Sequence, residues 1–415
     1  MNVVTVESQH KKSPFSFFIS HPLLDERAAS PNETIAMSME AALRDEALRS
    51  NASTLENGGL VWLEHINLAV GSRETTRMFY FAGMGFTEDP RKDATSTTIW
   101  ANVGPMQQLH LSLTAEGERP HVVNGTIGLA VHSLDALAAR LSGVALALAA
   151  TRMCFDPAPV ALDDGTRALT VVGPWGNRFV CYEVGDRAAE PFASPDPDDP
   201  VMAQRHANWD DDMSVRGSAG IRFVHFRITG SRGRGAPAKA ARFYSTVFGS
   251  PANSCSSSSS SASRDAAGAE ADFDIASVNV GQGTHFIFTQ STASGAGAAE
   301  AEAENERIER QRGVHVCVYT STFEASFEAL HARGLTGTNS RFRYLDRCDT
   351  LEEAQRSRQF RFYHITDLDG EEEGSSDGAT TPLLELEHET RCLRHSSFMQ
   401  PLVWAPQPPQ PPPPP

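Results

Sequence analysis

Apolar and polar residues alternate with a period of two in several short segments of the chain. Ile66 and Leu68 fall on one face of an extended backbone, whereas His65 and Asn67 fall on the other. Because alternate side chains of a strand point to opposite faces, this pattern predicts a strand with one apolar face against a core. Segments with the spacing of an amphipathic helix follow such strands, as at 134–141.

The same order of elements recurs along the chain. A strand that contains His65 leads through a helical segment to Phe79-Tyr80 and a glycine turn, and a strand that contains His225 leads to Phe243-Tyr244 and a second glycine turn. A weaker copy follows each of these segments. The sequence therefore predicts an α+β fold of four βαβββ units in two consecutive pairs, each pair a curved half-barrel sheet with its helices outside.

Changes in composition set the predicted domain boundaries. We expect, in chain order, a partly helical N-terminal extension (1–58), a first domain of two units with a degenerate site (59–186), a linker rich in proline and aspartate (187–218), a second domain of two units with a candidate metal site (219–392) and a proline-rich tail (393–415). Low-complexity runs predict loop insertions near 253–264, 292–308 and 369–381.

The composition narrows the range of functions. The 415 residues carry 36 Lys and Arg against 52 Asp and Glu, a formal net charge of −16, which argues against nucleic acid or an anionic membrane as the main partner. The six cysteines show no Cys-x-x-Cys motif, as is compatible with a reducing compartment, and we expect a cytoplasmic protein. The expected partner is a small-molecule substrate, and four units in one chain are compatible with a monomer.

The polar face of the predicted strands carries histidine or glutamate in several units. His225 and His315 occupy equivalent positions on first strands, His285 lies on a last strand, and Glu385 and Glu387 share one face of another last strand. Imidazole and carboxylate groups are the usual ligands of divalent transition metals, so this phase predicts a metal site in the second domain. The pattern does not choose between the two glutamates; we prefer Glu385.

The first domain has a poorer set of candidate ligands. His65 and His110 have the required phase, but Thr126 stands at the first-strand position of the second unit, and Val180 or Glu183 at its last strand. We therefore expect a degenerate site in the first domain.

Together these motifs resemble the vicinal oxygen chelate superfamily, which includes glyoxalase I, extradiol ring-cleavage dioxygenases and fosfomycin and bleomycin resistance proteins. The resemblance rests on the histidines at the strand starts, the aromatic pairs before glycine turns, the segment Pro174-Trp175-Gly176-Asn177 and the glutamate-rich last strand. Type I extradiol dioxygenases of this superfamily keep a degenerate N-terminal pair of units and a metal-bearing C-terminal pair, the asymmetry predicted here.

The extradiol-like interpretation implies a specific site. Fe(II), the preferred metal, would be held by His225, His315 and Glu385, with Glu387 as the alternative carboxylate. His285 would match an acid/base group. Tyr363, on the penultimate strand, would match a tyrosine that orients a bound catecholate.

Two further interpretations remain. A glyoxalase-like lyase or isomerase would use His225, His285, His315 and Glu385 together to bind Zn or Ni, and it would transfer a proton without consuming O2. A non-catalytic small-molecule-binding or scaffold protein would use the hollow of the sheet as a pocket, in keeping with the long low-complexity insertions.

Overall fold

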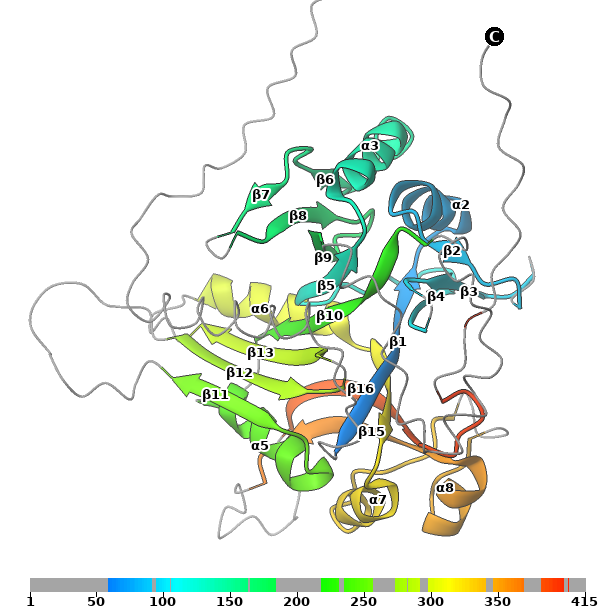
Figure 1. Cartoon of the computed structure of the whole chain (residues 1–415). Coiled ribbons are helices and arrows are strands. Elements are labelled where there is room, and N and C mark those ends of the chain that lie inside the picture. The colour runs from blue at the N-terminus through cyan, green and yellow to red at the C-terminus, as the bar shows by residue number, and fades with distance from the viewer. Residues whose placement is uncertain are drawn as a thin grey trace, which may run out of the picture.

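A computed structural model describes residues 59–91, 95–104, 106–162, 165–183, 218–230, 235–256, 273–281, 283–291, 298–340, 346–368, 382–398 and 402. The chain forms two mixed β-sheets, and neither closes into a barrel. Figure 1 shows helices α2 and α3 together at one end of the molecule and α5, α7 and α8 at the opposite end. The predicted α+β class is confirmed.

The first sheet has seven strands in the order β15-β16-β14-β1-β4-β3-β2. They are β1 (Leu60–Val70), β2 (Thr87–Glu88), β3 (Thr98–Asn102), β4 (Gln108–Leu113), β14 (His315–Thr320), β15 (Gln359–Thr366) and β16 (Pro382–Cys392). β1 is antiparallel to β14 and parallel to β4, and β14 is parallel to β16. The centre of this sheet therefore joins strands from the beginning and the end of the described chain.

The second sheet has nine strands, eight of them in the order β11-β12-β13-β10-β5-β9-β8-β6, with β7 paired to β8. They are β5 (Gly125–Val131), β6 (Cys154–Phe155), β7 (Val160–Ala161), β8 (Arg167–Val172), β9 (Arg178–Glu183), β10 (Gly220–Thr229), β11 (Ala252–Ser256), β12 (Phe273–Asn279) and β13 (His285–Ser291). β10 is antiparallel to β5 and parallel to β13, so this sheet repeats the central arrangement of the first.

Helices connect the strands within each unit. They are α2 (Arg73–Thr76), which continues as the π-helical segment η2 (Arg77–Gly83), α3 (Leu134–Val144), α5 (Ala236–Phe248), α6 (Ala298–Gln311), α7 (Phe323–His331) and α8 (Leu351–Ser357). Ser72, Ser133 and Thr350 cap α2, α3 and α8, each accepting a hydrogen bond from a backbone N–H in the first turn.

The predicted repeat is present in part. The first unit (β1 to β4) and the third unit (β10 to β13) have the order βαβββ. The second unit adds the short strand β7, and the fourth has only β15 and β16 after its helices among the described residues.

The predicted pairing of units into sheets is wrong. Consecutive units were expected to share a sheet, but the first sheet joins the first and fourth units and the second sheet joins the second and third. Consecutive units meet through side chains instead: Phe79 packs against Phe179, and Phe243 against Phe362, each with ring centroids 5.9 Å apart. Alternation shows which face of a strand is buried, but it does not show which strand lies at its hydrogen-bonding edge.

The first strands of the first and third units, β1 and β10, each carry two β-bulges at matching positions. The extra residues are Val61 and Glu64 in β1, opposite β14, and Ile221 and Val224 in β10, opposite β5. A bulge breaks strict alternation, because two residues of one strand face a single residue of its neighbour. The repeat thus includes the irregularities of the backbone as well as its regular elements.

Two of the predicted loop insertions contain regular structure. Residues 298–311 form helix α6, since alanine and glutamate favour a helix, and the backbone of 252–256 forms the edge strand β11. The N-terminal extension 1–58, most of the predicted linker and the predicted insertion at 369–381 lie outside the described residues.

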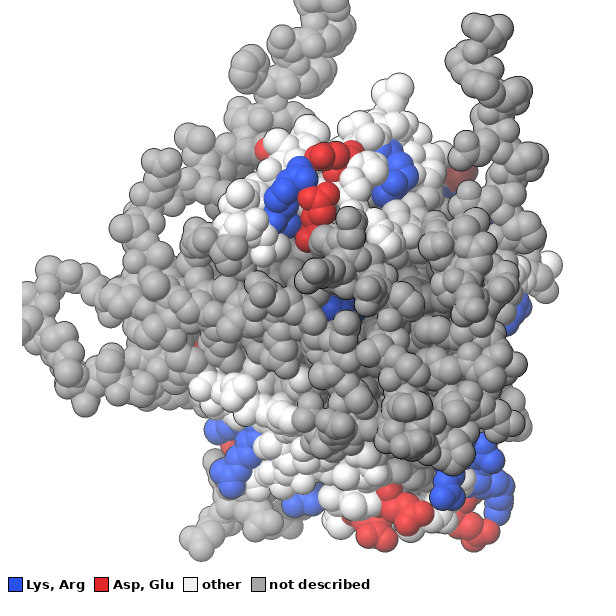
Figure 2. All heavy atoms as spheres, viewed as in Figure 1, with Lys and Arg blue, Asp and Glu red and all other residues white. Residues whose placement is uncertain are grey.

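Charged side chains form small mixed groups on the face shown in Figure 2. Arg167 pairs with Asp135 of α3 and with Glu183, and Arg356 pairs with Glu352 within α8. No helix among the described residues combines the length and the apolar character needed to cross a membrane.

Candidate metal centre

His65, His315 and Glu389 come together in the middle of the seven-stranded sheet. One potential ligand atom of each lies within 4.8 Å of the others, and all three residues are buried. They belong to three adjacent strands, β1, β14 and β16. Two imidazoles and one carboxylate are a typical ligand set for a divalent transition metal, and they leave coordination positions free for other molecules.

The bulge at Glu64 shapes this site. It brings the side chains of Glu64 and His65, neighbours in sequence, into contact, with Oε1 of Glu64 3.2 Å from Nδ1 of His65. A carboxylate only accepts hydrogen bonds, so Nδ1 carries the proton and Nε2 keeps its lone pair. That Nε2 atom is buried and has no hydrogen-bond partner among the described residues, as fits a metal ligand.

Glu64 is held in its charged form. Burial would raise its pKa, but Arg391 and hydrogen bonds with His65 and Tyr319 lower the pKa to about 2. Nη1 of Arg391 lies 2.7 Å from Oε1 of Glu64 and also donates to the Tyr319 hydroxyl at 3.1 Å. Glu64 therefore remains an acceptor near neutral pH and maintains the His65 tautomer.

Two arginines flank the Glu389 carboxylate. Arg361 and Arg391 each place a nitrogen 2.5 Å from one of its oxygens. Burial would raise the pKa of Glu389, but these guanidinium groups hold it well below its usual value. Arg361 also pairs with Glu387 at 2.9 Å and with Asp346 at 3.6 Å. With Glu64 included, four carboxyl groups therefore lie beside the guanidinium groups of these two arginines. This excess of negative charge favours a bound cation.

His110 lies beside the cluster. Its ring stacks on that of His65, with centroids 3.7 Å apart, and on that of Trp100, with centroids 4.7 Å apart. Nε2 of Gln108 donates to Asp89, which leaves Oε1 of Gln108 to accept from Nε2 of His110 at 3.0 Å. Nδ1 of His110 therefore keeps its lone pair.

Burial decides the protonation of the imidazoles. Burial and the neighbouring His65 lower the pKa of both His110 and His315 well below the usual value, so both rings are neutral near pH 7. A neutral imidazole is the form that binds a metal or accepts a proton. Cys317 has its sulfur within the same reach of Glu64 and His65, but burial raises the pKa of this thiol well above its usual value.

A cavity of about 1620 Å³ opens onto the cluster. It is lined by the three candidate ligands and His110, and it extends to residues 118–121 and to the C-terminal end of α6. Pockets for small molecules typically measure roughly 300–1,000 Å³, so this cavity has room for a small organic molecule beside a metal ion.

The structure separates the ligands predicted from the sequence. His315 lies in the cluster, but His225 and His285 are paired neighbours on β10 and β13 of the other sheet. Glu387 lines the cavity, whereas Glu385 does not and instead forms an ion pair with Arg312. The predicted set of His225, His315 and Glu385 is therefore not assembled on one sheet.

The structure also changes the roles predicted for Tyr363, His65 and His110. Tyr363 lies at a bulge of β15, outside the described lining of the cavity, and burial raises its pKa to about 12. His65 and His110, predicted as remnants of a degenerate site, line the cavity. Sequence reasoning missed Glu389, although it has the same strand phase as Glu385. The register of β16, which places Glu389 beside Cys317 of β14, was the missing information.

The degenerate site lies in the nine-stranded sheet. His225 occupies the register position of His65, but Thr126 and Val180 stand where the seven-stranded sheet has its second imidazole and its carboxylate. The Thr126 hydroxyl lies 3.0 Å from Nε2 of His225 and hydrogen-bonds to it. A hydroxyl and an isopropyl group here stand in place of two candidate metal ligands.

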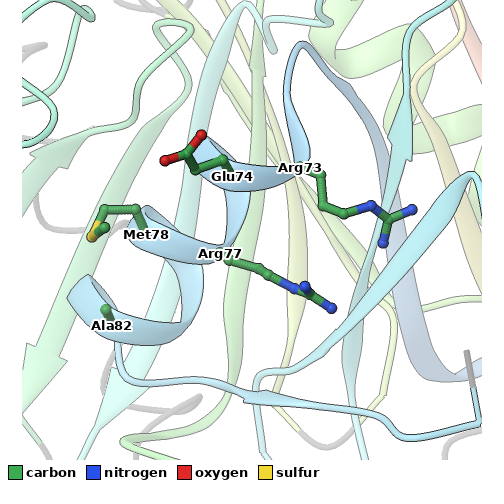
Figure 3. A pocket seen from close by; sticks show the side chains of 5 residues that line it. All are labelled: Arg73, Glu74, Arg77, Met78 and Ala82. Carbon is green, nitrogen blue, oxygen red and sulfur yellow. The ribbon is translucent and has the colours of Figure 1, made fainter. Parts of the chain in front are cut away.

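A smaller hollow of about 490 Å³ lies on α2 and η2. Figure 3 shows Arg73 and Arg77 extending to one side of this helix and Glu74 and Met78 to the other. Its described lining comes from one helical segment and brings no set of potential ligands together. We therefore place the candidate site at the larger cavity.

No known family model matches the chain, and no curated protein matches it in sequence. Its structure is similar to that of glyoxalase I from Zea mays, with 10% sequence identity and a TM-score of 0.45, over 79% of this chain and 92% of that chain. It is also similar to a member of the glyoxalase/bleomycin resistance protein/dioxygenase superfamily from Sphaerobacter thermophilus, with 22% identity and a TM-score of 0.23, over 30% of this chain and 98% of that chain. These similarities concern the fold alone.

Proposed function

We propose that the chain is a divalent-metal-dependent enzyme that acts on a small molecule with adjacent oxygen atoms. The observation that carries this proposal is the buried cluster of His65, His315 and Glu389, with ligand atoms within 4.8 Å of one another. Nε2 of His65, which has no hydrogen-bond partner in the described part of the chain, and the neutral His315 supply two lone pairs, and Glu389 supplies a carboxylate oxygen. The residues present therefore fit a metal ion.

The ligand set bears on the choice of metal. Two histidines and one carboxylate with open positions favour Fe(II), and the same set with a water in the fourth position would also suit Zn. A bound divalent ion would act as a Lewis acid that polarises a substrate oxygen.

The side chains of the chain itself supply the remaining functions. His110 is neutral, lines the cavity and keeps a lone pair on Nδ1, so it is our candidate to take a proton from the substrate and return it. Glu389 is not available as a base, because its oxygens pair with Arg361 and Arg391 and because this proposal assigns it to the metal. Trp100 stacks on the His110 ring and fixes its orientation.

These roles favour proton transfer, as in an isomerase or lyase. The extradiol-like alternative retains one supporting observation, the set of two histidines and one carboxylate. Its predicted accessory groups do not support it, since His285 lies in the other sheet and Tyr363 lies outside the described lining of the cavity.

Metal analysis tests the site. The full chain, purified without oxygen, is expected to bind about one divalent ion per molecule, and His65→Ala and Glu389→Gln should each remove most of it. His132→Ala replaces an exposed histidine outside the cluster and serves as the control. Wild-type protein that binds no metal, or variants that bind it equally well, would overturn the proposal.

The reaction type needs a second measurement. Exchange of a substrate carbon-bound proton with D2O, followed by NMR on small α-hydroxycarbonyl compounds, is expected with the metal-loaded wild type and not with His110→Ala. O2 uptake with catechols, without such exchange, would support the dioxygenase alternative in its place.

A further inference from the structure

Three arginines gather where the cavity meets the turn at 173–177. Arg119 and Arg310 line the cavity. Arg152 is bound to the same turn, since its backbone N–H donates to the carbonyl of Pro174 at 3.0 Å. We call Arg119, Arg152 and Arg310 the basic rim.

Trp175 is the common support of this group. Nη2 of Arg310 donates to its carbonyl oxygen at 3.1 Å. Its indole packs closely over Gly71, where an added Cβ would lie 2.8 Å from Nε1 of Trp175 and 3.3 Å from Cγ of Pro120. Pro120 directly follows Arg119. The turn at 173–177 and the loop that contains Arg119 are therefore held against each other.

The end of helix α6 is attached to the same loop. The backbone N–H of Val122 donates to the carbonyl of Arg310 at 2.9 Å, and that of Asn124 donates to Oε1 of Gln311 at 3.0 Å. These contacts hold Arg310 in place by its backbone, independently of its charge. The helix predicted as a loop insertion therefore contributes to the wall of the cavity.

The arginines of the basic rim differ from the other arginines of the cavity in their ion pairs with carboxylates. Arg312, Arg361 and Arg391 all form ion pairs with carboxylates. Within the part of the chain that the structure describes, the basic rim forms none. In a chain with a net charge of −16, two such guanidinium groups on one cavity wall, with that of Arg152 near enough to repel Arg310, are unexpected.

Neighbouring charges of both signs act on the guanidinium group of Arg310. Burial and repulsion by Arg152 and Arg119 lower the pKa of Arg310, while Glu306 on the same helix opposes the shift. His121, which also lines the cavity, adds no charge near pH 7, because burial lowers its pKa to about 4. A bound anion would relieve the repulsion among the guanidinium groups.

We propose that the basic rim binds an anionic group, a carboxylate or a phosphate, of the molecule whose other end reaches the metal centre. The assignment of this anion to the substrate rests on the proposed function; anion binding by the basic rim does not. A substrate with an anionic group at one end and adjacent oxygens at the other fits a cavity lined by arginines and by candidate metal ligands.

Titration calorimetry of the metal-free full chain at low ionic strength tests the anion site. Inorganic phosphate and succinate serve as probes, and the tighter of the two identifies the class of anion. Arg119→Gln and Arg310→Gln should each weaken the tighter probe about tenfold. Glu306→Gln should strengthen it several-fold. Arg307→Gln, on the exposed side of the same helix and outside the cavity lining, is the matched control and should have no effect.

The exposed Arg119 keeps the test decisive even if Arg310→Gln disturbs the contact with Trp175. Equal affinities of wild type, Arg119→Gln and Arg310→Gln, or an equal loss in Arg307→Gln, would overturn the inference. His65→Ala separates it from the proposed function: this variant should lose metal and keep the anion affinity. Anion binding in a wild type that holds no metal would reject the metal enzyme and leave the anion site standing.

Discussion

Tyr80 and Tyr244 occupy matching positions in the first and third units, yet their hydroxyl groups differ in hydrogen bonding. The hydroxyl of Tyr244 lies 2.8 Å from Nε2 of His388. Nδ1 of His388 donates to the carbonyl of Leu386 at 2.9 Å, so Nε2 accepts the proton of Tyr244. The hydroxyl of Tyr80 is buried and has no partner among the described residues. Replacing each tyrosine by phenylalanine is thus one chemical change in two environments.

The two substitutions are expected to change the free energy of unfolding in opposite directions. Tyr244→Phe leaves Nε2 of His388 buried and unpaired, which costs about 1–3 kcal/mol. Tyr80→Phe removes a hydroxyl that had already lost its hydration, so we expect it to stabilise the fold by about 1 kcal/mol. Both changes delete a single oxygen, so any cavity term is small and similar in the two variants.

Urea unfolding of the wild type and both variants measures the difference. Tryptophan fluorescence and circular dichroism should give coincident transitions before free energies are compared. The wild type should lie between the two variants in stability. Equal destabilisation of both, or a Tyr80→Phe variant less stable than Tyr244→Phe, would refute the reasoning.

Three further predictions concern buried polar groups and close packing. Burial lowers the pKa of His388 to about 3 from 6.5, so below pH 6.5 the unfolded chain takes up a proton that the folded chain excludes. The free energy of unfolding should therefore fall as the pH is lowered from 6.5 towards 3. An unfolding temperature that stays constant from pH 7.5 to 4.5 would contradict this. Glu64→Gln should weaken metal binding about 10–100-fold in a chelator competition, since the neutral amide holds the imidazole tautomer less firmly, and unchanged affinity would argue against that role. Gly128→Ala would place a Cβ 2.4 Å from Nδ1 of His225 and should cost about 1–3 kcal/mol in urea unfolding, whereas Gly143→Ala, whose Cβ meets nothing within 4 Å, should cost nothing; equal effects would contradict the packing argument.

The sequence predicted the strand phases well, because side-chain alternation is local. Phe226 and Ile228 are buried in the core, and His225 faces the other way, as the pattern indicated. The repeated aromatic pairs also identified helices that pack between units, since Phe79 and Phe243 make equivalent contacts. These features depend on neighbours within a few residues, which the sequence contains.

The partners of each strand could not be predicted in the same way. Glu385, Glu387 and Glu389 have the same phase. The register against β14 places Glu387 beside His315 and Glu389 beside Cys317, and Glu389 is the one with an oxygen within 4.8 Å of ligand atoms of both imidazoles. The contact between Glu64 and His65 depends on a bulge, and strict alternation places those side chains on opposite faces. Register and bulges are set by packing over the whole sheet, and a single sequence gives little information about it.

The pairing of β1 with β14 has a consequence for biosynthesis. When β1 leaves the ribosome, the strand that will cover one of its edges has not yet been translated, and β16 follows later still. During that interval the nascent chain exposes unpaired backbone groups beside a hydrophobic face, a state prone to aggregation. A fragment that ends before β14 should therefore aggregate more readily than the full chain.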